Sequence, residues 1–155
     1  MGLITSDEVE ELNNLAIHSM GKLNKNAASL VSKYKAGACT DVTGFGILGH
    51  LENLAEAQKN RHLNLRINKF PILNKTDSIE REIMGFNLLN GYSSETSGGL
   101  MCMLNEKDVN DFQQELEMKF GEKSWVIGEV LKTKDESKAT LAGDKEIIQV
   151  NQVFC

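Results

Sequence analysis

An aspartate followed by a glycine-rich turn is the most chemically suggestive feature of this sequence. Residues 38–50 read ACTDVTGFGILGH, and the turn after Asp41 leads directly into an apolar helical pattern. The first turn of a helix presents unpaired N–H groups and a partial positive charge, which favour an anion such as phosphate. A bare carboxylate would repel that phosphate, whereas Mg²⁺ binds carboxylate and phosphate oxygens together. The pattern therefore predicts a metal–phosphate site in which Asp41 is the magnesium ligand.

A second segment rich in hydroxyls and glycines lies further along the chain. Residues 93–99 read SSETSGG and precede the apolar run 100–104. Successive backbone N–H groups in such a turn can form a nest that receives an anion, although the same residue types also make ordinary turns. Two side chains keep two interpretations each. Glu95 is either a contact to a metal or an amine or a solvated loop charge, and we favour the solvated charge. His50 is either a phosphate contact or a structural hydrogen-bonding residue, which is the commoner role of a histidine at a helix start.

The glycines of the first segment also fit a dinucleotide-binding fingerprint. Gly44, Gly46 and Gly49 spell G-x-G-x-x-G, which is a weak signal by itself. A dinucleotide-binding unit carries an acidic residue about 20 residues later, at the end of the next strand. Residues 67–69 read INK at that place. The context therefore disfavours a nicotinamide-dinucleotide site, and the glycines alternatively serve only close strand–helix packing.

Length, charge and cysteine usage narrow the class of protein. The 155 residues predict one domain, 1–155, and the net charge of −5 argues against a nucleic-acid binder. No apolar run approaches the roughly 20 residues that span a bilayer, and the N-terminus lacks a signal peptide. We therefore expect a cytoplasmic protein with neither a membrane nor a nucleic-acid partner. Cys39, Cys102 and Cys155 are odd in number and widely separated, which indicates reduced thiols, with Cys39 and Cys102 buried in strands.

Hydrophobic periodicity predicts an α+β fold, a mixed β-sheet covered by helices. A capping box at Thr5 and Glu8 begins a helix that reaches about residue 31 with a break near Gly21. The remaining helices are expected at 46–58, at 76–91 with Ile79, Ile83 and Met84 on its apolar face, and at 106–120 with Gly121 as its C-cap. Strands are expected at 36–41, 62–67, 100–104 (a central strand) and 125–130, with Pro71 in a connection and a closing hairpin of 138–142 and 146–150.

The two glycine-containing motifs, taken together and in this order, resemble the C-terminal domain of selenophosphate synthetase (selenide, water dikinase). That family carries A-[CA]-T-D-[VI]-T-G-F-G-[IL]-L-G-H followed by P-[EQ]-T-S-G-G-L-L, and residues 38–50 and 94–101 are the counterparts here. Residues 23–28 and 125–128 also resemble its eukaryotic members, so the resemblance runs over almost the whole chain, from about residue 20 to residue 150. One departure is Ser94, which stands where the family has proline.

The resemblance implies a fold, an activity and a set of site residues. The fold would be that of the C-terminal domain in the aminoimidazole ribonucleotide synthetase superfamily, where ATP lies between an N-terminal and a C-terminal domain. The family converts ATP, selenide and water to selenophosphate, AMP and phosphate, with magnesium and potassium ions assisting. Asp41 would hold magnesium on the phosphates. The nucleotide-binding residues implied are Thr40, Asp41, Thr43, Gly44, Gly46, Thr96, Ser97, Gly98 and Gly99.

The resemblance also implies a partner. The family's glycine-rich nucleotide loop, reactive cysteine or selenocysteine, catalytic lysine and other metal aspartates belong to its N-terminal domain and have no counterpart in these residues. We therefore expect this chain to pair with the N-terminal domain of its parent protein, a homodimer, and to be inactive alone, with no catalytic residue of its own. The alternative is a non-catalytic paralogue, or a binding or regulatory module of the same fold.

Overall fold

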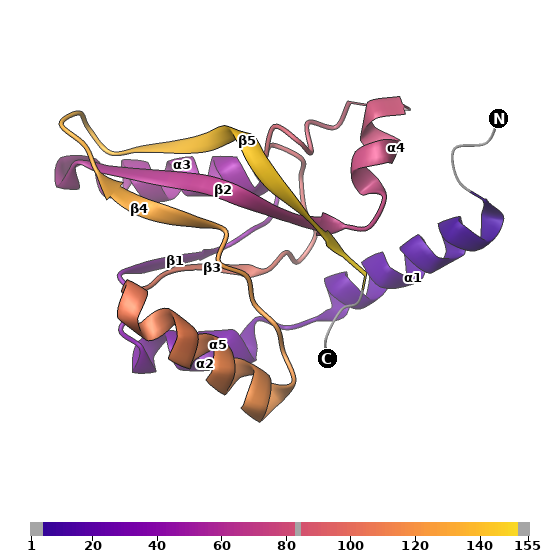
Figure 1. Cartoon of the computed structure of the whole chain (residues 1–155), viewed down its shortest axis with the longest axis horizontal. Helices are drawn as coiled ribbons and strands as arrows, with labels where there is room; N and C mark the ends of the chain where they lie inside the picture. The colour runs from indigo at the N-terminus through magenta and orange to yellow at the C-terminus, as the bar shows by residue number, and fades with distance from the viewer. Residues whose placement is uncertain (1–4, 83–84, 152–155) are drawn as a thin grey trace.

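The computed structural model of the chain describes residues 5–82 and 85–151. Its elements, shown in Figure 1, are α1 (Ser6–Gly21), α2 (Lys25–Lys33), β1 (Ala38–Asp41), α3 (Gly46–Glu56), the 3₁₀ turn η1 (Lys59–Arg61), β2 (Leu63–Leu73), α4 (Thr76–Glu82), β3 (Leu100–Met103), α5 (Glu106–Phe120), β4 (Gly128–Lys132) and β5 (Lys138–Val150). β1 and β3 form an antiparallel ladder, and a second sheet has the strand order β4-β2-β5. The predicted α+β class is confirmed, but the strands form two sheets instead of one.

The first two helices have the predicted break between them. The capping box is present, since the Thr5 side chain accepts from the Glu8 N–H and the Glu8 carboxylate accepts from the Thr5 N–H. α1 ends at Gly21, and no residue of α1 is buried. It extends away from the sheets in Figure 1, and an ion pair between Glu8 and Lys75 ties its first turn to the segment after β2. No helix in the described ranges is long and apolar enough to cross a bilayer.

The main core lies between α3 and the three-stranded sheet. α3 contributes Ile47, Leu51 and Ala55, and β2 contributes Leu65, Ile67, Phe70 and Ile72. The inward side chains of β2 alternate up to Ile67, skip two positions, and resume at Phe70. A register shift against β5 between Ile67 and Lys69 accounts for this break, because an irregularity in the ladder resets which face each side chain occupies. Val42 and Met101 join the same core from the β1–β3 ladder.

The predicted closing hairpin is wrong. β5 runs from Lys138 to Val150 as one strand, parallel to β2 on both sides of the register shift. Gly143 and Asp144, predicted as its turn, lie in the part of β5 opposite the irregularity at Asn68. Parallel pairing lets both halves of the long segment bond to the same edge of β2, whereas a hairpin would leave half of that edge unpaired.

The predicted helix at 76–91 is too long. α4 ends at Glu82, Ile83 and Met84 lie outside the described residues, and residues 85–91 form bends and turns. The carboxylate of Glu80 accepts the backbone N–H groups of Leu88 and Leu89, at 2.7 and 2.9 Å. This side chain therefore replaces the helical carbonyls as hydrogen-bond partner, and the chain turns back instead of continuing the helix.

Three strand predictions need smaller corrections. β2 continues through Pro71, predicted to lie in a connection. Pro71 pairs with Ile148 of β5, whereas β4 pairs with residues 63–67 of β2. The N–H that proline lacks is therefore not needed for a hydrogen bond to β4. β3 is not a central strand, because the described residues give it one neighbour, β1. The strand expected at 125–130 starts later, at Gly128. Just before it, the carbonyl of Ile127 accepts the N–H groups of both Asn68 and Lys69.

A second, smaller core joins α2 to α5. Leu30 packs with Phe112 and Leu116, one helical turn apart on α5. The predicted α5 boundaries and its Gly121 C-cap are confirmed, with Gly121 at φ 68°.

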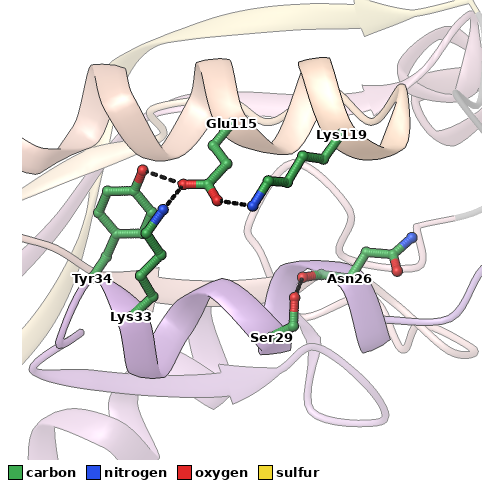
Figure 2. A network of polar contacts seen from close by, with 6 residues as sticks. All are labelled: Asn26, Ser29, Lys33, Tyr34, Glu115 and Lys119. Carbon is green, nitrogen blue, oxygen red and sulfur yellow. Dashed lines mark hydrogen bonds and ion pairs between the residues drawn. The ribbon is translucent and has the colours of Figure 1, made fainter.

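A polar network beside this second core joins the end of α2 to α5 (Figure 2). The Glu115 carboxylate accepts from the Tyr34 hydroxyl at 2.6 Å and pairs with Lys33 and Lys119. Hydrogen bonds from Lys119, Lys33 and Tyr34 lower the pKa of Glu115 to about 2. The network therefore links the two helices through a carboxylate held in its charged form.

Candidate nucleotide and metal site

Asp41 ends β1 at an exposed position. The next residue, Val42, is buried in the main core with 5% exposure, and its N–H donates to the Gly99 carbonyl at 3.0 Å. The alternation of a strand therefore turns the carboxylate of Asp41 away from the core while its neighbour is fixed within it. Asp41 is available to a ligand and stands on a backbone that packing holds in place.

The structure brings the two glycine-containing motifs into direct contact. The carbonyl of Thr43 accepts the N–H of Glu95 at 3.0 Å, and the Ser94 hydroxyl donates to the Gly44 carbonyl at 2.7 Å. Ser94 is the residue that departs from the family pattern, and its hydroxyl supplies a hydrogen bond that a proline could not. The loop after Asp41 and the turn before β3 therefore form one continuous surface.

Two glycines are required where these segments meet. Gly46 has φ +71°, and a Cβ on it would lie 2.5 Å from the Gly91 carbonyl oxygen. A Cβ on Gly98 would lie 2.2 Å from the carbonyl oxygen of Val42. Both neighbours are backbone atoms, so no side-chain rotation could relieve the overlap. These glycines permit the approach of one motif to the other.

The predicted nucleotide-binding residues differ in how accessible they are. Asp41, Gly44, Thr96, Ser97 and Gly99 are exposed, Thr40, Thr43 and Gly98 are half-buried, and Gly46 is buried. The helix start is less open than its sequence suggests. The Gly46 N–H donates to the Thr43 carbonyl and the Leu48 N–H to the Gly91 carbonyl. These two amides of the first turn of α3 therefore already have partners within the protein.

The turn at 96–99 is more open than the start of α3. Within residues 5–82 and 85–151, the backbone N–H groups of Thr96, Ser97, Gly98 and Gly99 make no hydrogen bond. Ser97 has φ 52°, a left-handed conformation uncommon for a residue with a side chain. Consecutive unpaired N–H groups around such a residue are the arrangement in which backbone nests bind anions. The folded turn therefore leaves its N–H groups free to bind an anion.

His50 has a structural role in this site. Its Nε2 accepts the Thr43 N–H at 2.9 Å and lies 3.1 Å from the Thr43 hydroxyl oxygen. The Phe45 ring packs edge-on against the imidazole, with centroids 5.5 Å apart. Of its two sequence interpretations, the structural one accounts for these contacts, because the imidazole holds the loop that follows Asp41.

Glu95 departs from the favoured expectation of a solvated loop charge. The residue is exposed overall, but its Oε2 lies 2.6 Å from the position that a Cβ on Gly98 would take. The carboxylate thus folds back over the turn, and its burial there raises the pKa of Glu95 to about 7. Shifted carboxyl groups of this kind are enriched at functional sites, and this one lies against a turn whose N–H groups are unpaired.

Sequence reasoning missed one residue that holds the turn and one that holds the segment around that residue. The Asn24 side-chain amide donates to the Gly98 carbonyl at 3.0 Å. Glu122 does not bond to the turn, but it is 6% exposed, accepts from the Asn26 side chain at 2.8 Å and lies 3.6 Å from the Lys22 ammonium. The resemblance of residues 23–28 to family members was a signal for Asn24, whereas nothing local marks Glu122.

The metal-binding capacity of this surface rests on Asp41. In the described ranges, no three or more His, Cys, Asp and Glu side chains cluster as a metal site. An open hollow of about 1440 Å³ extends along much of the molecule, and its lining includes residues 93–99 and Asn24 but not Thr40, Asp41, Thr43, Gly44 or Gly46. Mg²⁺ commonly takes one or two protein carboxylates, with phosphate oxygens and waters completing its shell. The donor set therefore fits a metal shared with a phosphate ligand and does not fit an all-protein metal centre.

Comparison with known proteins places the chain in a family. Residues 2–139 match the family model "AIR synthase related protein, C-terminal domain". The chain belongs to this family. It is 40% identical to a probable selenide, water dikinase of Caenorhabditis elegans over 149 residues, which cover 92% of the chain and 39% of that protein.

Further relatives carry the same name. Selenide, water dikinase of Trypanosoma brucei brucei is 38% identical over 96% of the chain and 38% of its own length. Selenide, water dikinase 2 of Mus musculus is 41% identical over 84% of the chain and 29% of its own length. The resemblance inferred from the two motifs is confirmed, and the chain spans well under half the length of these relatives.

The nicotinamide-dinucleotide interpretation fails on topology. A dinucleotide-binding unit places the strands before and after its glycine-rich helix parallel and in one sheet. Here β1 and β2 flank α3 but belong to different sheets. Gly46 therefore serves the meeting of the two motifs and Gly49 the close packing at the start of α3, and the G-x-G-x-x-G spacing does not mark a pyrophosphate site on a doubly wound sheet.

Proposed function

We propose that this chain is the C-terminal half of a selenophosphate synthetase and contributes one wall of an ATP–magnesium cleft. The parent protein would convert ATP, selenide and water to selenophosphate, AMP and phosphate. The observation that carries this proposal is the contact between the two motifs, in which the loop after Asp41 bonds to Glu95 and Gly99. The relatives named selenide, water dikinase support the same assignment.

The chemistry of the wall follows from its residues. Asp41 would supply a carboxylate oxygen to magnesium, which neutralises phosphate charge when it is bound. The unpaired amides at 96–99 would receive phosphate oxygens directly, in an arrangement that needs no reorganisation on binding. Thr40, Thr43 and Gly44 would line the same surface, while Gly46 positions the loop. Asp41 lies outside the lining of the hollow and is exposed, which suits a wall completed by a second domain.

The missing wall would come from the N-terminal domain of the parent, which would also carry the reactive residue and most of the dimer contacts. With one wall, the isolated chain would bind nucleotide weakly, because association costs at least about 4 kcal/mol before contacts compensate. We therefore expect it to be inactive alone. Turnover restored by the N-terminal domain, and not inactivity of the isolated chain, would distinguish a synthetase half from a non-catalytic paralogue or a binding module.

Magnesium-dependent nucleotide binding is the first test. Backbone amide NMR spectra are recorded while Mg²⁺ and a non-hydrolysable ATP analogue are added to the chain. The proposal predicts shifts at Asp41, Gly44, Gly98 and Gly99 that require magnesium and that Asp41→Asn abolishes. The matched control is Asp144→Asn, an exposed aspartate on β5, which should leave the shifts unchanged. Unaltered shifts with Asp41→Asn would refute the metal role of Asp41.

Complementation then tests the parent activity. The N-terminal half of the parent is added in trans, and AMP release from ATP is followed with and without selenide. Restored, selenide-dependent AMP release that Asp41→Asn removes supports the synthetase. Nucleotide binding without any restored turnover, with a competent N-terminal half, would favour the paralogue or binding module.

A further inference from the structure

Cys39 on β1 and Cys102 on β3 are direct partners across the antiparallel ladder. The N–H of Val42, the residue after β1, donates to the Gly99 carbonyl at 3.0 Å, and this single bond fixes the phase of the hydrogen bonds at that end of the ladder, with Val42 opposite Gly99 at a hydrogen-bonding position. Hydrogen-bonded and non-hydrogen-bonded pairs alternate along antiparallel strands. Three positions further along, Cys39 and Cys102 therefore form a non-hydrogen-bonded pair.

That kind of pair has the geometry of a cross-strand disulfide. Its Cα atoms lie about 4.5 Å apart and its side chains share one face of the ladder. Disulfides span Cα separations of about 4.4–6.8 Å. Cys39 contributes, after burial, to the raised pKa of Cys102, as expected for neighbouring sulfurs. Rotation of the two side chains can therefore bring the sulfurs together without moving the strands.

The surroundings leave this pair open to reagents. Cys39, predicted to be buried, is exposed, and Cys102 is half-buried. The residues that alternate with them, Thr40 and Met101, point to the opposite face, where Met101 joins the main core. A bond between the two sulfurs would thus form outside the packed core and leave its side chains in place.

We propose that Cys39 and Cys102 form a reversible disulfide by exchange with low-molecular-weight disulfides such as glutathione disulfide. The Cys39 thiolate attacks one sulfur of glutathione disulfide and releases one glutathione thiolate. The Cys102 thiolate then attacks the Cys39 Sγ and releases the second. The protein loses two protons and two electrons, and one glutathione disulfide becomes two glutathione molecules. Burial raises the pKa of Cys102 to about 11, which lowers the fraction of Cys102 that is present as the reactive thiolate.

The bond would act on the candidate site through the backbone. Cys39 lies two residues before Asp41, and Cys102 lies three residues after Gly99. A disulfide would link the strand that presents Asp41 to the strand that follows the open turn. It would also close a long loop and so restrict the unfolded chain, which stabilises the folded one.

Oxidation of the purified chain tests the proposal. Cys155, outside the described residues, is first replaced in a Cys155→Ser background. The protein is incubated folded with excess glutathione disulfide, and its intact mass, non-reduced peptide map and thermal midpoint are measured. We expect a mass lower by about 2 Da, one peptide pair joining Cys39 to Cys102, and a midpoint higher by about 5–15 °C that dithiothreitol reverses.

Single variants in the same background provide the controls. Cys39→Ser and Cys102→Ser should each show neither the mass loss nor the midpoint rise. A protein that keeps one glutathione on Cys39 without closing the bond would overturn the proposal. A linked protein with a lower midpoint would overturn it too, because the bond would then require distortion of the ladder.

Discussion

Replacement of Gly46 by alanine should damage the fold through the contact between the two motifs. An alanine at φ +71° adopts a left-handed conformation, which costs roughly 1–2 kcal/mol. Its Cβ would also lie 2.5 Å from the carbonyl oxygen of Gly91. It would lie 2.8 Å from both the carbonyl oxygen of Ser93 and the carbonyl carbon of Tyr92. These are backbone atoms, and overpacking of this kind costs about 1–3 kcal/mol. The free energy of unfolding should therefore fall by about 2–5 kcal/mol.

Urea unfolding, followed by circular dichroism, measures this loss. With a slope of about 2 kcal/mol per molar urea, the midpoint should fall by about 1 M or more. The matched control is Gly44→Ala in the same loop, where an added Cβ meets no atom within 4 Å. Gly44→Ala should change the free energy of unfolding by no more than about 0.5 kcal/mol. The reasoning is refuted if Gly46→Ala unfolds at the wild-type midpoint, or if both variants lose equal stability.

Three further predictions address the Glu95 carboxyl group, the polar network and the second core. Since the pKa of Glu95 is raised to about 7, above the unfolded value of 4.5, stability should fall as pH rises between these values. Glu95→Gln should remove that slope in urea unfolding from pH 4 to pH 8. The pKa of Glu115 is lowered to about 2, chiefly by its hydrogen bond from Lys119. Glu115 should therefore stabilise the fold fully above pH 4.5, and this contribution should be lost as the pH falls towards 2. Acid titrations of Glu115→Gln should be flatter in this range, and an unchanged profile would contradict the assignment. Leu116→Ala, at 2% exposure, should cost about 2–5 kcal/mol, whereas Met118→Ala, at 86% exposure, should stay within about 0.5 kcal/mol in the same unfolding assay.

The candidate site could be predicted in its parts but not as a whole. The Asp41 loop and the 96–99 turn carry local signals, because glycines, hydroxyls and a carboxylate favour both turns and anion or metal sites. Their contact, through Thr43 and Glu95, joins segments far apart in the sequence. The raised pKa of Glu95 follows from that contact. The Asn24 bond to Gly98 likewise depends on where α2 lies, which periodicity does not state.

The sequence by itself determined what depends on neighbours a few residues away. The Thr5–Glu8 capping box, the break after Gly21 and the C-cap at Gly121 are each local choices of the backbone, and each is present. The same holds for the family, because contiguous motifs carry it. Such features follow from hydrogen bonds and dihedral preferences within about one or two helical turns.

Only the tertiary structure decided which segments pair and where elements end. β5 has a hairpin signal at Gly143 but pairs in parallel with β2, because bonding along the whole β2 edge satisfies more backbone groups than a local turn. Residues 88 and 89, predicted as helix, instead donate their amides to the Glu80 side chain. Cys39 faces Cys102 only through the β1–β3 register. Each outcome is set by the competition of distant groups for the same hydrogen bonds and the same core, which no local pattern contains.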